Sequence, residues 1–383
     1  MAIFSSDTSP GAVQNVGAGG AKGAEPPSIW RLPARSRALE QALNSGEPVL
    51  ALAPMQDVTD LPFWRLLSEY GGPDIYWTEY SRVHSTSNID RAVLKAIQEN
   101  PTGRPAIAQL IGNDAEALAK AASELQGHPV VAVDLNLGCP APVVYRKCAG
   151  GGLLREPERI DRILGAMRQA VTDVAFTVKT RIGFDDTEVF ETLLEIVARH
   201  RVDLLTVHGR TVREMYRSEV RYGFIRRAVE ALGCPVLANG NVYSPGRAEQ
   251  VLAETGARGL MIGRGCIRNP WIFGQIRDHR AGRGFRRPTG REVLDYVRRL
   301  YEATQPTAGF RERLQVEKMK KYMNFVGDGI SPDFLHRIRR ATTRDEFFTA
   351  CNDHLDHERP MDLVPVPNVA SETSAETVEE TCG

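Results

Sequence analysis

The sequence predicts an α/β protein: a closed (β/α)8 TIM barrel followed by a smaller C-terminal all-helical domain. Eight short apolar runs alternate with helical patterns between residues 49 and 265, and only helical patterns follow Arg280. Apolar strands that are each followed by a helix form a parallel sheet covered on its outer face. Eight such units in roughly 230 residues fit a closed barrel better than an open sheet. An open doubly wound sheet is the alternative, but no GxGxxG follows the first run.

The predicted strands are short runs rich in Val, Ile, Leu and Ala. They are VLALAP (49–54), DIYWTEY (74–80), PAIAQLIG (105–112), VVAVDLNLG (130–138), AFTVKTRIG (175–183), VDLLTVHG (202–209), CPVLANG (234–240) and RGLMIGRG (258–265).

The segments between these runs carry helix punctuation. In SPGRAEQVLAETGA, Ser244 is a predicted N-cap, Pro245 takes the first helical position and Gly256 follows the end. The segments 157–171 and 185–200 repeat an apolar face at helical spacing, and the second opens on acidic residues.

The C-terminal part predicts three or four basic amphipathic helices over 291–304, 311–326 and 331–355. Residues 281–350 hold 15 Lys and Arg against 9 Asp and Glu, a net charge of +6, whereas residues 352–383 hold 1 against 8, a net charge of −7. The first charge pattern fits either a polyanion-binding surface or an ordinary solvated helical surface. We expect a disordered leader over 1–45, the barrel over 46–282, a helical domain over 283–356 and an acidic disordered tail over 357–383.

Composition indicates a globular protein, with 42% hydrophobic and 25% charged residues. No apolar run approaches the ~18 residues of a membrane span, and no signal peptide is visible. The six cysteines form no CxxC pair, which is typical of a reducing cytoplasm. We expect no metal, no membrane association and a monomer.

A barrel carries its chemistry at the carboxyl ends of its strands. Nearly every predicted strand here ends in a side chain that can hydrogen-bond or ionise. In chain order these ends are Pro54, Met55 and Gln56; Glu79; Gln109; Asn136 with Cys139; Lys179 with Arg181; His208; Asn239, Gly240 and Asn241; and Gly263 with Arg264.

The last two strand ends favour a phosphate site. Gly240 and Gly263 let backbone N–H groups approach a phosphate, and Arg264 adds a positive fork. Lys179 has two interpretations: a Schiff-base nucleophile, or a positive charge beside the N1–O2 edge of a flavin. Gln109 and Met55 favour the flavin, since an amide can pair with its pyrimidine edge and an apolar strand end can support its ring.

Seven segments in this order resemble the tRNA-dihydrouridine synthases over about residues 48–280, and the helical part does so loosely. They are LAPMQDVTDLPFWRL, AQLIG, VDLNLGCPAPVVYRKCAGGGLL, VKTRIG, LTVHGRT, VLANGNV and LMIGRG. The resemblance implies an enzyme that uses FMN, reduced by NADPH, to saturate the C5=C6 bond of a uracil base in tRNA. It implies hydride transfer from N5 of FMNH2 to C6 and proton transfer from Cys139 to C5.

The resemblance, carried over by motif match, implies a role for the strand-end residues other than Glu79. Asn136 and Arg181 would contact the uracil. The residues that would hold FMN are Pro54, Met55, Gln56, Gln109, Lys179, His208, Asn239, Gly240, Asn241, Gly263 and Arg264.

A cysteine suits the role of acid here. A free thiol has a pKa of about 8.5, so at neutral pH it is still largely protonated and can donate to C5. The turn from Asn136 to Pro140 would aim the thiol, and the glycines of AGGG would let the loop fold over the base.

Two positions depart from or complicate the family pattern. Asn241 stands where the family commonly has an acidic residue, and Cys148 follows Cys139 in the same predicted loop. TEYSRVH resembles the branch of the family that acts at position 16 of tRNA.

A base buried in folded tRNA must be extruded to react, and the surrounding phosphates need a basic surface. The candidates for that surface are Lys318, Lys320, Lys321, Arg337, Arg339 and Arg340. Three alternatives stay open: an FMN barrel oxidoreductase for a free dihydropyrimidine or dihydroorotate-type molecule, a Schiff-base lyase using Lys179, and an inactive tRNA-binding module.

Overall fold

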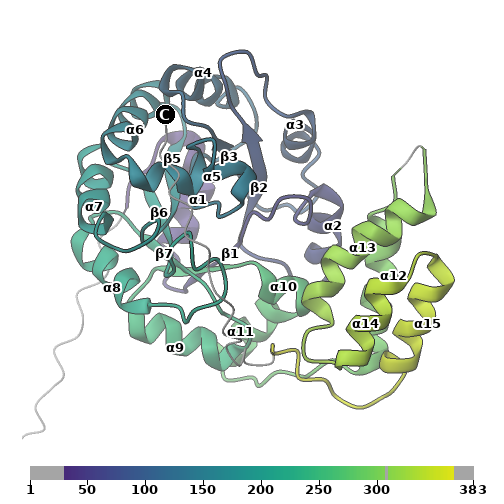
Figure 1. The fold of residues 1–383 in the computed structure, drawn as a ribbon. Helices are drawn as coiled ribbons and strands as arrows, with labels where there is room; N and C mark the ends of the chain where they lie inside the picture. The colour runs from purple at the N-terminus through teal and green to yellow at the C-terminus, as the bar shows by residue number, and fades with distance from the viewer. Residues whose placement is uncertain (1–29, 307–308, 366–383) are drawn as a thin grey trace, which may run out of the picture.

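The computed structural model describes residues 30–306 and 309–365, and its strands close into one parallel barrel (Figure 1). Each strand pairs with its neighbour in sequence, and the first strand closes the ring by pairing with the last. The strands are β1 (Val49–Leu52), β2 (Ile75–Arg82), β3 (Ala106–Ile111), β4 (Ala132–Leu137), β5 (Ala175–Arg181), β6 (Leu204–His208), β7 (Val236–Asn239) and β8 (Gly259–Ile262). They coincide with the eight predicted runs, which confirms the (β/α)8 barrel.

Helices cover the outside of the barrel, as the apolar character of both strand faces requires (Figure 1). They are α2 (Leu61–Glu69), α3 (Arg91–Gln98), α4 (Ala115–Leu125), α6 (Pro157–Ala170), α7 (Phe190–Arg199), α8 (Tyr222–Ala231), α9 (Pro245–Thr255) and α11 (Ile272–Arg280). Two short helices, α5 (Pro142–Tyr145) and α10 (Arg264–Arg268), lie in the segments that follow the carboxyl ends of β4 and β8.

The predicted caps of α9 are confirmed. The Ser244 hydroxyl accepts the Arg247 N–H at 3.2 Å, and Gly256 ends the helix with a φ of 66°. Helix α7 instead begins at Phe190, after the acidic residues expected to open it. Asp186 there accepts the Glu188 N–H at 3.0 Å, so the acidic stretch forms a turn before the helix.

The amino-terminal end of the barrel interior is apolar and is closed by a short helix. Leu39 and Leu43 of α1 (Arg37–Leu43) are fully buried against the inward-facing residues of the strands, with Trp30 and Leu32 packed beside them. The predicted disordered leader is therefore wrong for residues 30–45, because its apolar residues cover the barrel floor. The rest of that leader, residues 1–29, lies outside the described residues.

In the part of the chain that the structure describes, four helices follow the barrel and pack together beside it (Figure 1). They are α12 (Gly290–Ala303), α13 (Glu312–Val326), α14 (Pro332–Arg340) and α15 (Arg344–Leu355). Thr289 and Thr343 begin α12 and α15 with complete capping boxes. Within the described part of the chain, no helix is long and apolar enough to cross a membrane.

Helix α13 fixes this bundle to the rim of the barrel, at the loop between β1 and α2. The Tyr322 hydroxyl donates to the Val58 carbonyl at 2.9 Å, and the Lys318 amine binds Asp60 at 2.9 Å. The loop that leads from the first strand end is thus in direct contact with the helical bundle.

The expected acidic disordered tail also begins with ordered residues. Pro360 forms a bridge with Thr289, the Met361 N–H donates to the Pro288 carbonyl at 2.8 Å, and Leu363 is buried. The tail prediction is therefore wrong for this part, where the chain packs against the start of α12. Residues 366–383 lie outside the described residues.

Candidate active site

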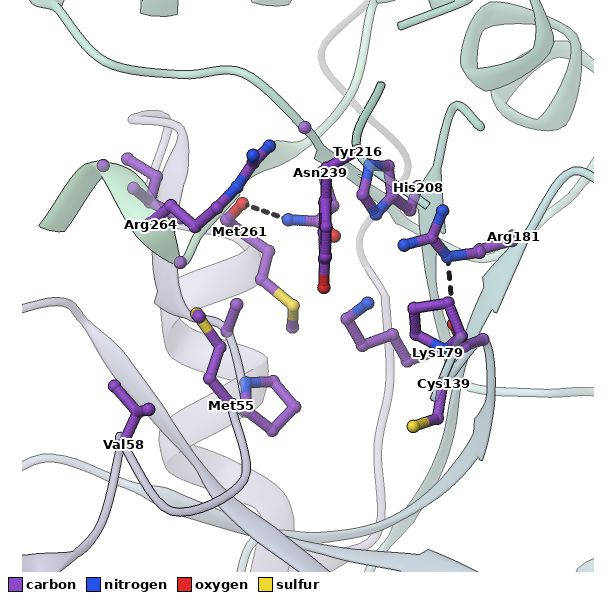
Figure 2. A pocket seen from close by; sticks show the side chains of 18 of the residues that line it. Met55, Val58, Cys139, Lys179, Arg181, His208, Tyr216, Asn239, Met261 and Arg264 are labelled. Atoms are coloured by element: carbon purple, nitrogen blue, oxygen red, sulfur yellow. Dashed lines mark hydrogen bonds between the residues drawn. The ribbon is translucent and has the colours of Figure 1, made fainter. Parts of the chain in front are cut away.

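A cavity of about 360 Å³ opens at the carboxyl ends of the strands. Figure 2 shows Lys179 and Cys139 on one side of it, with Met55 and Arg264 across from them. The predicted site residues that line it are Pro54, Met55, Gln56, Asn136, Cys139, Lys179, Arg181, His208, Asn239, Gly240, Asn241, Gly263 and Arg264. Gln109 is the exception among the predicted residues, since it is fully buried and is not part of this lining.

Cys139 sits in a turn that the preceding strand end holds by hydrogen bonds. The Asn136 Oδ1 accepts the N–H groups of Gly138 at 3.0 Å and Cys139 at 2.9 Å. Behind the turn, the Gly151 N–H donates to the Cys139 carbonyl at 3.2 Å, and a Cβ at Gly151 would lie 2.8 Å from that carbonyl oxygen. The glycines of AGGG therefore let the following segment pack closely against the cysteine backbone.

Tyr80 also lines the cavity and packs with Ile111 and Val144 beside Cys139. Burial raises the pKa of Tyr80 to about 12, and the neighbouring Cys139 thiol adds to this rise. Cys139 is partly exposed to the cavity, whereas Cys148 is buried. The cavity therefore presents the Cys139 thiol to a ligand.

Lys179 points into the cavity from the end of β5 (Figure 2). Burial lowers the pKa of its amine to about 8, and repulsion from Arg181 lowers it further, while Asp134 and Cys139 oppose the shift. Among the described residues that line this cavity there is no Asp or Glu. The site is thus electropositive and suited to an anionic ligand.

Arg181 is 1% exposed and holds the strand-end loops together. Its Nε donates to the Gly138 carbonyl at 3.0 Å, and its Nη1 donates to the carbonyls of Thr211 and Met215, both at 2.8 Å. Burial lowers the pKa of its guanidinium to about 10. Arg181 therefore supports the Cys139 turn directly, in addition to lining the cavity.

His208 contacts a second arginine. Its Nε2 lies 3.2 Å from the Arg210 Nη1. A guanidinium can only donate, so this nitrogen accepts and the imidazole is neutral, with its proton on Nδ1. Burial, followed by repulsion from Arg181 and Lys179, holds the pKa of His208 well below its usual value.

The ends of β7 and β8 form the opposite corner of the cavity. Gly240 has a φ of 128°, and its carbonyl accepts the Tyr222 hydroxyl at 2.7 Å. A Cβ at Gly263 would lie 3.0 Å from the Met55 Sδ, so a side chain there would fill this corner. The Arg264 Nη2 donates to the Asn241 Oδ1 at 3.1 Å, so the amide at position 241 orients Arg264 as a carboxylate would.

Several lining residues were not predicted. Most of them lie in loops or in the helical bundle, whereas Tyr80 ends the predicted run 74–80, of which only Glu79 was taken as the strand end. Tyr216 lies in the loop after β6, with its ring 4.4 Å from the Arg264 guanidinium carbon, and Phe325 comes from α13 of the helical bundle. The other lining residues that sequence reasoning missed include Tyr80, Met215 and Tyr243.

The basic residues proposed to face a polyanion fall into two groups, those in ion pairs and those on the exposed surface. Lys318, Lys320, Lys321 and Arg337 form ion pairs with Asp60, Glu317, Asp57 and Asp353. Arg339 and Arg340 are exposed, and Arg340 lies 3.2 Å from His336. Most of the excess positive charge in α13 and α14 is therefore neutralised locally.

The family model and the sequence relatives indicate the same family. The family model described as dihydrouridine synthase (Dus) matches residues 51–351. A probable tRNA-dihydrouridine synthase of Rickettsia prowazekii (strain Madrid E) is 34% identical over 258 residues, covering 66% of this chain and 77% of that protein. The tRNA-dihydrouridine synthase B of Xanthomonas axonopodis pv. citri (strain 306) is 34% identical over 311 residues, covering 81% and 93%.

Among solved structures, a complex of 2-naphthoyl-CoA reductase with 2-naphthoyl-CoA matches with a TM-score of 0.51 and 12% identity. The match covers 83% of this chain and 68% of that one. At this identity the similarity supports the shared fold alone.

Proposed function

This chain belongs to the dihydrouridine synthase family, and from that premise we propose that it reduces the C5=C6 bond of a uridine in tRNA with a bound flavin. The observation that carries the proposal is the placement of Cys139 and Lys179 on one side of an electropositive cavity at the strand ends. A proton donor and a fixed positive charge are the two groups that such a reduction requires from the protein.

The chemistry of the cavity lining and the size of the cavity support the proposal of FMN as the flavin. Its volume of about 360 Å³ lies within the range of small-molecule sites, about 300–1,000 Å³. Gly240, Gly263 and Arg264 would hold the phosphate, and Lys179 and His208 would meet the ring. The remaining residues proposed to hold FMN are Pro54, Met55, Gln56, Asn239 and Asn241. When bound and reduced by NADPH, FMN would supply a hydride to C6 of the uracil.

Gln109 has a different place in this proposal. Its Nε2 donates to the Asp134 carboxylate at 2.7 Å, and its Oε1 accepts from the Asn136 Nδ2 at 2.9 Å. Both ends of the amide are already engaged below the cavity. Gln109 would therefore act on the site through Asn136, which would contact the uracil together with Arg181.

Cys139 would protonate C5 of the base. The thiol is exposed to the cavity, and its backbone is fixed by Asn136 and by the Arg181 contact with Gly138. A neutral His208 beside Lys179 would donate from Nδ1 without adding charge. The division of roles places the proton donor and the positive charge on different side chains.

The tRNA would present an extruded uridine to the cavity mouth, where Phe325 brings the helical bundle into the lining. We propose the barrel over 46–282 as the catalytic domain and the bundle over 283–356 as the tRNA-binding domain. Arg339 and Arg340 are the candidates for phosphate contact that the ion pairs leave available. A tRNA substrate would place the protein in the cytoplasm.

The test is a visible spectrum of the purified protein under anaerobic conditions. We expect flavin bands that bleach on addition of NADPH and recover only when tRNA lacking dihydrouridine is added. A bleached flavin that tRNA does not reoxidise would move the substrate to a free small molecule. A colourless protein that cannot be reconstituted with FMN, and that borohydride traps at Lys179, would contradict the redox proposal altogether.

A further inference from the structure

A carboxyl group lies inside the barrel, below the cavity and outside its lining. Asp134 on β4 is fully buried, two residues before Asn136. In the described residues it forms no ion pair within 4.0 Å, and both of its oxygens accept from side chains. The Thr177 hydroxyl donates to Oδ1 at 2.5 Å, and the Gln109 Nε2 donates to Oδ2 at 2.7 Å.

These three side chains meet because of strand register. Asp134 pairs in register with Gln109 on the preceding strand and with Thr177 on the following one. Residues at matched positions on adjacent parallel strands project to the same side of the sheet. The barrel therefore brings the three groups to one level of its interior.

The carboxylate is the first member of a hydrogen-bonded chain that ends at the cysteine turn. Gln109 donates to Asp134 and accepts from the Asn136 Nδ2 at 2.9 Å. The Asn136 Oδ1 then accepts the N–H groups of Gly138 and Cys139 at 3.0 and 2.9 Å. Two side-chain amides thus link a buried acid to the backbone of the proposed proton donor.

The two ends of this chain require the same orientation of the amides. An ionised carboxylate can only accept, and a backbone N–H can only donate. The amides of Gln109 and Asn136 satisfy both ends in one arrangement. Flipping Gln109 would set its amide oxygen against the Asp134 carboxylate, acceptor against acceptor, and flipping Asn136 would set its Nδ2 against the N–H groups of the turn, donor against donor. The acid therefore fixes which atom of Asn136 faces the Cys139 N–H.

We propose that Asp134 is a positioning residue that acts through Gln109 and Asn136 to hold the Cys139 turn. Burial raises the pKa of Asp134 to about 6, while its hydrogen bonds with Thr177 and Gln109 and the charge of Lys179 oppose the rise. A buried acid without an ion pair is unfavourable for folding, and an apolar residue would fill this place in the core more readily. The retained carboxylate supplies the acceptor on which the chain depends.

The catalytic consequence rests on the proposed function, in which Cys139 must face C5 of the base. A loosened turn would slow protonation while leaving the binding of flavin unaffected. The test itself does not depend on catalysis, because it measures the turn in the flavin-free protein. Failure of the positioning role and failure of the proposed reaction are therefore distinguishable.

The experiment compares amide hydrogen exchange in wild type, Asp134→Leu and Asp134→Asn. We expect Asp134→Leu to speed exchange at Gly138 and Cys139 by about tenfold or more, with the amides of β7 within about twofold of wild type. Asp134→Asn keeps an acceptor for Gln109 and donates to the Thr177 hydroxyl, which can accept, so we expect exchange within about threefold of wild type.

Unchanged exchange at Gly138 and Cys139 in folded Asp134→Leu would overturn the proposal. So would equal acceleration in Asp134→Asn, since the acceptor is then irrelevant. If Asp134→Leu does not fold, Gln109→Met breaks the same chain at its next member. Exchange at Gly138 and Cys139 as slow as in wild type in that variant would overturn the proposal in the same way.

Discussion

At the scale of single residues, the proposed reaction depends most on Cys139. The cavity presents its thiol, and Asn136 and Arg181 hold the turn that carries it. We predict that Cys139→Ala is reduced by NADPH at a rate within about twofold of wild type. Reoxidation of its flavin by tRNA should slow by about 100-fold or more, the usual effect of removing a general acid.

Anaerobic stopped-flow absorbance separates these two half-reactions. Cys234→Ala serves as the matched control, because Cys234 lies outside the cavity lining. Reoxidation of Cys139→Ala at the wild-type rate would show that another group protonates the base.

We expect the buried amine of Lys179 to lower the stability of the folded protein and to strengthen the binding of FMN. Its pKa falls from 10.5 to about 8 in the folded protein, mainly through burial, so between these pH values the folded state binds fewer protons than the unfolded state. Stability should therefore rise with pH across this window, by on the order of 3 kcal/mol. Lys179→Met should be more stable than wild type at pH 7 in the flavin-free form, yet bind FMN more weakly.

Thermal unfolding of both flavin-free proteins between pH 7 and pH 10 measures this difference. The stability gap should close toward the alkaline end. A stability difference that is constant with pH would mean that burial does not lower the pKa of Lys179.

The site residues at strand ends can be predicted from the sequence, because a barrel places those ends at one rim. Residues whose position depends on loop conformation, such as Tyr216, or on packing of the bundle, such as Phe325, cannot be predicted in this way. Asp134 was visible only as one member of the apolar run 130–138. Its hydrogen bonds depend on the register of three strands, and the pattern of a single strand does not contain that information.

At the scale of elements, the loop between β1 and α2 joins the cavity to the helical bundle. Glu79 Oε1 accepts the Val58 N–H of this loop at 2.9 Å, and Tyr322 of α13 binds the Val58 carbonyl. Burial, together with the negative charge of Asp60, raises the pKa of Glu79 to about 7. The loop that carries Met55 and Gln56 is thus fastened by an acid that titrates near neutrality.

We predict a pH-dependent effect of Glu79→Gln. The folded pKa lies above the usual value of 4.5, so the stability associated with the protonated acid is full below pH 4.5 and is lost as pH rises through 7. Glutamine keeps the acceptor and removes the charge. Chemical denaturation should give equal stabilities near pH 5 and a more stable variant near pH 8, whereas identical pH profiles would refute the assignment.

The helices and strands themselves followed from local patterns, with two informative differences. The acidic start of α7 formed a turn instead of a helical first turn, since Asp186 caps the Glu188 N–H. The segment 37–43, with seven residues, is too short to predict an ordered helix alone. Its burial depends on the barrel floor, which is assembled from all eight strands.

At the scale of the whole molecule, the bundle serves both docking and the proposed tRNA contact. Lys318 and Lys321 bind Asp60 and Asp57 across the interface with the barrel, so the net charge of the segment overstated the surface available to RNA. We predict that the double variant Arg339→Ala and Arg340→Ala weakens tRNA binding. The negative slope of log affinity against log salt concentration should become shallower by about 0.7–0.9 for each phosphate that the variant no longer neutralises.

Lys318→Met is the comparison variant for this measurement. Because its amine is ion-paired with Asp60, we expect a lower melting temperature with little change in the salt slope. A salt slope that changes in Lys318→Met and stays constant in the double variant would reverse the assignment of these two surfaces.

The central claim is that this barrel reduces uridine in tRNA, and the most direct measurement is the product itself. The protein, FMN and NADPH are incubated with tRNA lacking dihydrouridine, and the nucleosides are analysed by mass spectrometry. The account predicts dihydrouridine with wild-type protein and at most a trace with Cys139→Ala. Absence of dihydrouridine from a flavin-loaded, NADPH-reducible wild-type protein would contradict it.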